Sequence, residues 1–168
     1  MSPQVSPSHD ELADLVGLFY DAALDNELWV GSSERIAKAF GATSTVLKLH
    51  RADEQVSLVE VTPNMIVADK LQDWASHWHS RDLWVERSVS FGLSRIVTDD
   101  DLVSEEERQK TGFYREWLRH LDIYRMLGAA FSAGESGIGV LGIHRPEDAP
   151  QFGEEERHRV SILLPHLK

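Results

Sequence analysis

Apolar and polar residues alternate with two different periods along the chain, and these periods predict its elements. Apolar residues three or four positions apart predict helices over Glu11–Leu24, from Ser32 or Ser33 to Gly41, over Ala68–His79 and over Leu83–Phe91. Alternation with a period of two predicts strands at Thr43–His50, Val56–Val61, Ser94–Thr98, Ile123–Phe131 and Ile138–His144. In the first strand, Leu47 and Leu49 point to one face, and Lys48 and His50 to the other.

Two sequence signals mark helix starts. Ser8 with Glu11, and Ser104 with Glu107, have the spacing of a capping box, in which each side chain reaches a free backbone N–H of the first turn. The second box predicts a long helix that continues to about His120.

The chain closes on GEEERHRVSILLPHLK, which begins like a helix and contains no glycine or asparagine that would end one. Three acidic residues follow Gly153, where the helix dipole favours negative charge. Apolar residues at Val160, Leu163, Leu164 and Leu167 form one face. We therefore expect the helix to run to the last residue.

The order of these elements predicts an α+β fold. Five short strands with hairpin connections favour a mostly antiparallel sheet of about five strands, with helices on its faces. Residues 1–9 include a Ser/Pro-rich stretch and are expected to be disordered, and residues 10–168 form a single domain of ordinary size.

Charge and composition narrow the function classes. The chain carries 28 acidic and 17 basic residues, a net charge of -11, so we expect no direct nucleic-acid binding by this chain. Without a long apolar run or a basic leader, the sequence indicates no membrane association and a cytoplasmic location. The absence of cysteine excludes thiol nucleophiles, disulfides and cysteine zinc sites.

Several short motifs resemble binding or catalytic sites, but the sequence favours a structural explanation for each. The glycines of GIGVLGIHR, residues 137–145, have dinucleotide-site spacing but no following helix, so we interpret them as strand glycines. His77 and His79 diverge by about 200° on a helix, which favours surface histidines. Asp99–Asp101 is interpreted as an exposed acidic turn rather than a cation site. No nucleophile–base pair is recognisable, so no enzyme activity, metal or cofactor is expected.

Tryptophan is the unusual feature of the sequence. Of five tryptophans, three lie in WASHWHSRDLW, at Trp74, Trp78 and Trp84. Trp74 and Trp78 are four residues apart and share one helix face. Such rings line small-molecule pockets, or they fill a core; both interpretations remain open.

Three stretches together resemble a known family. SRDLWVERSV (80–89), TGFYREWLRHLDIYRMLGAAF (111–131) and the closing RVSILLPHLK are similar to the N-terminal GAF/PAS-like sensory domains of LuxR-type helix-turn-helix transcriptional regulators. The resemblance extends from about residue 10 to the end. Family members often have D-P-W where this chain has Asp82, Leu83 and Trp84, and the Asp-Pro pair of the lactone sensors is absent. Lactone binding is therefore not implied.

The resemblance implies a signal-sensing regulatory domain. A small apolar or amphipathic ligand would bind between sheet and helices, and the last helix would connect to a DNA-binding domain that this chain lacks. The domain would form a homodimer through its N- and C-terminal helices. The alternative is a ligand-independent dimerisation or protein-interaction module. The ligand-binding candidates, with Asp82 as the acceptor for a ligand amide, are Trp74, Trp78, Asp82, Trp84, Phe113 and Trp117.

Overall fold

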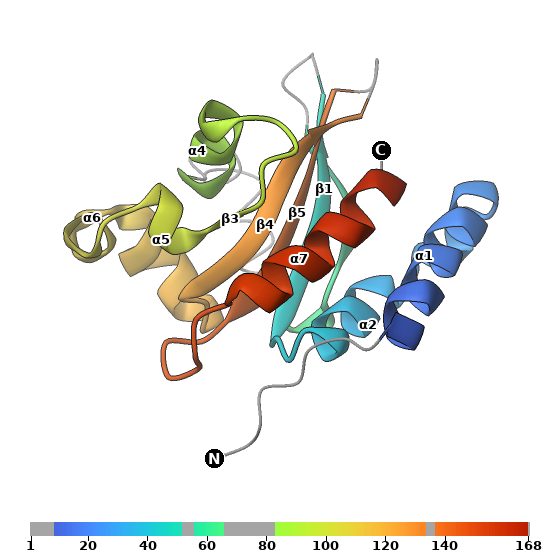
Figure 1. The fold of residues 1–168 in the computed structure, drawn as a ribbon. Helices are drawn as coiled ribbons and strands as arrows, with labels where there is room; N and C mark the ends of the chain where they lie inside the picture. The colour runs from blue at the N-terminus through green and yellow to red at the C-terminus, as the bar shows by residue number, and fades with distance from the viewer. Residues whose placement is uncertain (1–8, 52–55, 66–82, 134–136, 168) are drawn as a thin grey trace.

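The computed structural model describes residues 9–51, 56–65, 83–133 and 137–167, and it shows an α+β fold (Figure 1). Within these residues five strands form one sheet in the order β2-β1-β5-β4-β3, and each neighbouring pair is antiparallel. The strands are β1 (Ser44–His50), β2 (Val56–Val61), β3 (Val97–Thr98), β4 (Arg125–Ser132) and β5 (Ile138–Arg145). The predicted fold class is confirmed, and each predicted strand overlaps an observed one, including the glycine-bearing stretch that forms β5. Of the predicted strand Ser94–Thr98, only Val97–Thr98 is a strand.

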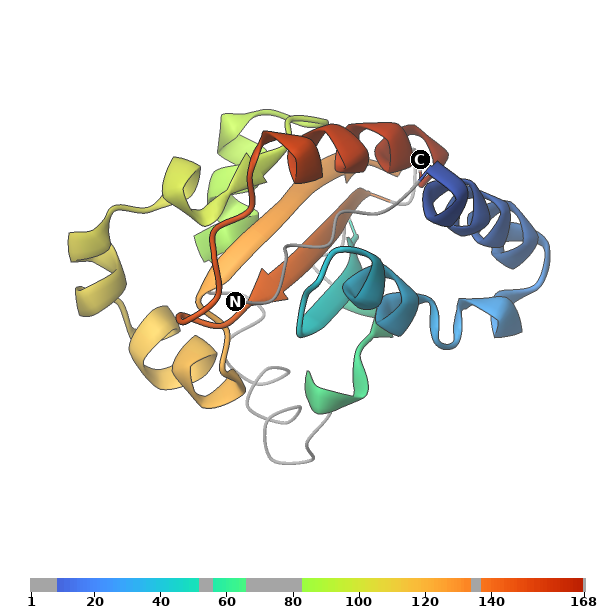
Figure 2. The same cartoon turned by 60° about the horizontal axis from the view of Figure 1, so that its bottom comes forward.

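Three helices cover one face of the sheet (Figures 1 and 2). They are α1 (His9–Leu24), α2 (Ser32–Ala39) and α7 (Glu154–Leu163). Short 3-10 turns follow α1 and β2, namely η1 (Asn26–Trp29) and η2 (Pro63–Met65). The apolar core between helices and sheet includes Leu12, Leu15, Phe19, Ile36, Phe40, Leu47, Leu127, Phe131, Leu141, Ile143, Val160 and Leu163.

The remaining helices lie on the opposite side of the sheet (Figure 1). They are α4 (Leu83–Phe91), α5 (Asp99–Leu102) and α6 (Glu105–Lys110), followed by the π-turn η4 (Phe113–Trp117) and the 3-10 turn η5 (Leu118–Leu121). The range predicted for α4 is confirmed. A second apolar cluster joins these elements to the sheet and consists of Trp84, Val97, Leu102, Val103, Tyr114, Trp117, Leu118, Ile123 and Met126.

The long helix predicted after Ser104 is wrong, although its capping box is confirmed. The Glu107 N–H donates to Ser104 Oγ at 3.2 Å, and the Ser104 N–H donates to Glu107 Oε1 at 3.3 Å. The α-helix ends at Lys110, because Thr111 is extended with φ -80° and ψ 139°. Thr111 and Gly112 both have low helix propensity, and the chain continues in irregular turns instead.

The start of α7 agrees with the sequence, but its end does not. Its acidic first turn follows Gly153, whose N–H donates to Glu156 Oε2 at 3.2 Å. The α-helix ends at Leu163 and tightens into the 3-10 turn η7 (Leu164–His166), because Pro165 has no N–H to donate. None of the helices in the described part of the chain has the length and apolarity that crossing a membrane requires.

Candidate functional site

One face of the sheet carries polar side chains that α4 covers. Along β1 and β5, alternate residues pair across the ladder, so that Ser44 lies opposite His144, Val46 opposite Gly142, and Lys48 opposite Val140. These side chains point away from α1, α2 and α7, since Leu47 and Ile143 of the other face belong to the core on that side. This arrangement places a lysine and a histidine beneath a helix.

A small cavity lies between this face and α4. Trp84 and Ser88, four residues apart, are the buried positions of α4. The cavity has a volume of about 30 Å³, room for about two water molecules. Part of the space exists because Gly142 has no side chain: a Cβ there would lie 3.0 Å from His144 Nε2. The described lining residues are Val46, Lys48, Trp84, Val85, Ser88, Met126, Ala129, Val140, Leu141, Gly142 and His144.

Trp84 is held in place by aromatic and polar contacts. Its ring stacks on the His144 imidazole, with centroids 5.7 Å apart and planes 22° from parallel. Its Nε1–H donates to the Tyr114 hydroxyl at 2.6 Å. Burial raises the pKa of Tyr114, so the hydroxyl stays neutral and accepts this bond well above physiological pH. His144 Nδ1 lies 2.9 Å from Ser44 Oγ, which orients the imidazole.

The structure locates some of the residues predicted to bind a ligand. Trp84 lines the cavity. Trp117 is buried in the second apolar cluster and is not among the described lining residues. Phe113 opens the π-turn η4. Three predicted positions lie outside the described residues, namely Trp74, Trp78 and Asp82, as do the predicted helix Ala68–His79, His77 and Ser8.

Sequence reasoning missed the polar part of this face. Lys48 and His144 are each 4% exposed, although an alternating polar residue on a strand normally faces solvent. The only signal in the sequence was that Lys48 and His144 lie on the same strand faces as Val46 and Val140. A face that carries both polar and apolar residues predicts that another element covers it.

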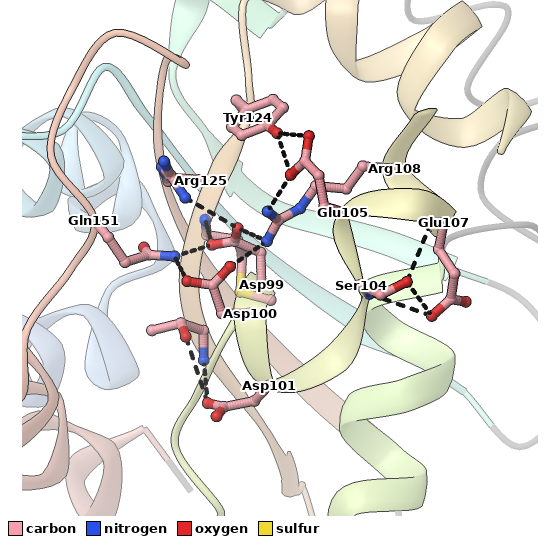
Figure 3. Close-up of polar contacts among 12 residues, drawn as sticks. Asp99, Asp100, Asp101, Ser104, Glu105, Glu107, Arg108, Tyr124, Arg125 and Gln151 are labelled. Atoms are coloured by element: carbon pink, nitrogen blue, oxygen red, sulfur yellow. Dashed lines mark hydrogen bonds and ion pairs between the residues drawn. The ribbon is translucent and has the colours of Figure 1, made fainter. Parts of the chain in front are cut away.

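Asp99–Asp101, predicted as an exposed turn, forms most of α5. Asp100 and Asp101 are exposed as predicted, whereas Asp99 is buried in a polar network (Figure 3). Asp99 is completely buried and contacts the guanidinium of Arg108, itself 6% exposed. The Met126 N–H and the Gln151 amide each donate to Asp99 Oδ1 at 2.9 Å. Burial raises the pKa of Asp99, while these hydrogen bonds act in the opposite direction. For Asp99 the prediction of an exposed position failed, because its pairing with Arg108 has no hydrophobic signature in the sequence.

The outer side of this network faces solvent. Arg108 also donates to Asp100 at 2.6 Å and to Glu105 at 3.1 Å, and Glu105 accepts a bond from the Tyr124 hydroxyl at 2.9 Å. A hydrogen bond from the Gln151 side chain, followed by that of Arg108, lowers the pKa of Asp100. The network thus joins α5, α6, β4 and the loop before α7 (Figure 3).

Two arginines connect this network to helices on both faces of the sheet. Arg87 of α4 donates to the Leu102 carbonyl at 2.7 Å and lies 2.5 Å from Glu107. This bond from Arg87 lowers the pKa of Glu107 to about 2. Arg157 of α7 donates to Asp101 at 2.7 Å and to Thr98 Oγ1 at 3.2 Å. Polar contacts therefore join α4 to the end of α5 and α5 to α7, and the backbone of α5 links the two sets.

Comparison with known proteins gives similar structures but no related sequences. No protein-family model and no curated protein sequence matches the chain. The LBD domain of VqsR from Pseudomonas aeruginosa is 14% identical with a TM-score of 0.65, over 91% of this chain and 88% of that one. CepR2 from Burkholderia cenocepacia, an N-acylhomoserine lactone dependent LuxR family transcription factor, is 14% identical with a TM-score of 0.65, over 93% and 90%.

A GAF domain shows the same likeness more distantly. The GAF domain/HD domain protein from Geobacter sulfurreducens is 16% identical with a TM-score of 0.52, over 91% of this chain and 95% of that one. At these identities the likeness concerns the fold. The chain therefore has the GAF-like α+β fold of LuxR-type ligand-binding domains, as its sequence led us to expect.

Proposed function

We propose that this domain is a regulatory sensor, which binds a small apolar or amphipathic molecule beneath α4 and transmits its state to α7 and a DNA-binding domain connected to it. The observation that carries the proposal is the cavity under Trp84, on a sheet face that mixes apolar walls with buried polar groups. Pockets for small molecules have this composition. The GAF-like fold supports the same assignment by analogy.

The small size of the cavity supports a conformational response. A drug-sized ligand needs roughly 300 Å³ or more, whereas this cavity has about 30 Å³. In this proposal a ligand larger than a few atoms displaces α4, which carries Trp84 and Ser88 of the described lining. Binding then favours an open arrangement of α4 over the closed one, and this difference in affinity is what shifts the equilibrium between the two states.

The polar contacts offer a route from α4 to α7. Displacement of α4 would pull on Arg87 and through it on the Leu102 carbonyl at the end of α5. Asp101, the neighbour of Leu102 in α5, accepts a hydrogen bond from Arg157 of α7. A shift of the Leu102 backbone would therefore move Asp101 and its contact with α7.

The first test is a screen of intrinsic tryptophan fluorescence against a metabolite library. We expect hits that change the emission of the wild-type protein and not that of Trp84→Phe, because Trp84 lines the cavity. With such a hit bound, hydrogen exchange of the α7 amides should change. Arg157→Gln should reduce that change severalfold without weakening binding, because it removes the contact with Asp101.

Glu155→Gln is the control, since it changes an exposed ion pair on the same helix. If α7 exchange responds to the ligand equally in Arg157→Gln and in the wild type, the route through α5 is wrong. If no compound of the library changes the emission of Trp84, the proposal that a small molecule binds beneath α4 is wrong.

Self-association is the second candidate function, and a specific surface favours it. The apolar stripes of α1 and α7 that led us to expect a homodimer pack into the protein's own core, so they are not available to a second copy. Other apolar residues around the end of α1 remain exposed, with Leu24 at 92% and Val30 at 80%. Exposed apolar groups gathered in one region mark interaction sites. We propose that a second copy of the chain covers Tyr20, Leu24, Leu28 and Val30.

Leu24→Asp should raise the dimer dissociation constant about tenfold or more, because burying a leucine contributes about 1.5–3 kcal/mol. Sedimentation equilibrium measures this constant. Phe91→Asp is the matched control, as Phe91 is 46% exposed on the other side of the sheet. A wild-type protein that stays monomeric at high concentration, or a dimer that tolerates Leu24→Asp, rules out this surface.

A further inference from the structure

Lys48 is the unusual residue of the cavity. It lies in the middle of β1, is 4% exposed and lines the cavity under Trp84. Lysines are rarely buried so completely, because removing an ammonium from water is costly. Lys48 has interactions of its own within the protein, so the argument concerns the sign of the charge it brings to the cavity and not a free ammonium.

The charge of the cavity contrasts with that of the chain. The described lining residues include one lysine and one histidine but no carboxylate, whereas the whole chain has a net charge of -11. Inside a protein, where the dielectric is low, a positive group next to a cavity selects strongly against cations and in favour of anions. The described walls therefore carry two basic side chains and no acidic one.

The rest of the lining defines the uncharged part of a guest. Val46 and Val140 flank Lys48 on the sheet, since Val140 is its direct partner across the ladder. The Trp84 ring and Met126 complete an apolar wall. A ligand that satisfies both regions has an anionic end and an apolar body.

We infer that the ligand of this site is a small organic acid, whose carboxylate lies next to Lys48 Nζ and whose apolar part contacts Trp84 and the flanking valines. This inference rests on the proposed function and names the class of ligand at the same site. The carboxylate shares or displaces the present partners of Lys48, and the apolar part displaces α4. Neutral analogues lose the contact with Lys48, and amines are repelled by it.

The test uses matched pairs of probes that differ only in charge: acetate and acetamide, and benzoate and benzamide, at constant ionic strength set with sodium chloride. Acetate is small enough for a cavity of about 30 Å³ to need little enlargement. Binding to the folded state raises the melting temperature by mass action. In the wild type we expect the carboxylates to bind about tenfold or more tightly than their amides, as one charge-assisted contact provides.

Lys48→Met removes the charge and keeps an unbranched apolar stem, and it should reduce this preference to less than about threefold. Lys110→Met is the control, since Lys110 is exposed and pairs with Glu106 at the surface; the preference should persist there. Should Lys48→Met be too unstable, a titration of the wild type alone by tryptophan fluorescence still compares acids with amides.

Each outcome separates the two proposals. Equal stabilisation by acetate and acetamide, abolished by Trp84→Phe, overturns the anion inference and leaves the ligand site standing. A preference for carboxylates that survives Lys48→Met places the anion elsewhere and also overturns it. No response to any of the four probes contradicts the organic-acid assignment, and the metabolite screen then decides the proposed function by itself.

Discussion

Replacing Asp99 with alanine is expected to lower the free energy of unfolding by about 3–5 kcal/mol, the usual effect of removing one partner of a buried ion pair. Asp99 is fully buried and contacts Arg108, which is itself 6% exposed. The substitution also leaves the Met126 N–H without its acceptor and removes one of the two acceptors of the Gln151 amide. A buried donor that loses its acceptor costs about 1–3 kcal/mol, so the two effects together reach the expected range.

Urea unfolding followed by tryptophan fluorescence measures this difference, and two further variants isolate its cause. Asp99→Asn keeps the shape but not the charge, and should still destabilise the protein because an amide presents N–H groups to the Arg108 donor. Asp100→Asn should cost less than about 1 kcal/mol, since the side chain of Asp100 is 55% exposed where it meets Arg108. Equal effects of Asp99→Asn and Asp100→Asn are the result that contradicts a buried ion pair at Asp99.

The apolar pattern was sufficient to predict the sheet and α4. Each strand alternates core-facing and outward residues, as Leu47 and Lys48 do in β1, and this period survives folding because a strand has two faces. The range of α4 was predicted from its apolar spacing, and in the structure the helix ends before Gly92, whose φ is +135°. An apolar spacing that also packs against the rest of the protein can therefore be recognised from the sequence.

The pattern could not predict groups whose environment depends on distant elements. Asp99 is buried because β4 and the loop before α7 supply donors to it, and neither lies near it in sequence. Lys48 is buried on a sheet face whose cavity is also lined by Trp84 and Ser88 of α4, far from it in sequence. The helix predicted beyond Lys110 failed for a local reason, since Thr111 is extended and ends α6 although the apolar spacing continues beyond it.

The same two clusters that sequence reasoning missed are those on which the proposed mechanism depends. The cavity uses Lys48 and His144, and the route to α7 uses Asp101 and Arg157. Polar groups buried at covered faces are costly, and proteins keep them where they have a structural or functional role. The ion pair of Asp99 with Arg108 has the structural role of fixing α5, which the route to α7 requires to be rigid.

Gly128→Ala is expected to destabilise the protein by about 3 kcal/mol, near the upper end for overpacking. Gly128 in β4 lies directly opposite Gly142 in β5. A Cβ on Gly128 would come within 2.1 Å of the Leu141 carbonyl oxygen and 3.3 Å of the Gly142 Cα. These atoms belong to the backbone of the neighbouring strand and cannot move without disrupting the ladder that forms the floor of the cavity.

Gly142→Ala, its partner across the ladder, is the matched control. Its Cβ would meet side chains only, His144 Nε2 at 3.0 Å and Val46 Cγ1 at 3.2 Å, and these can yield by a few tenths of an ångström. We expect a loss of less than about 1.5 kcal/mol, together with weaker binding of any ligand, because the new methyl group enters the cavity. Thermal and urea unfolding measure both variants. Equal stability losses would show that β4 and β5 are not packed through this glycine pair.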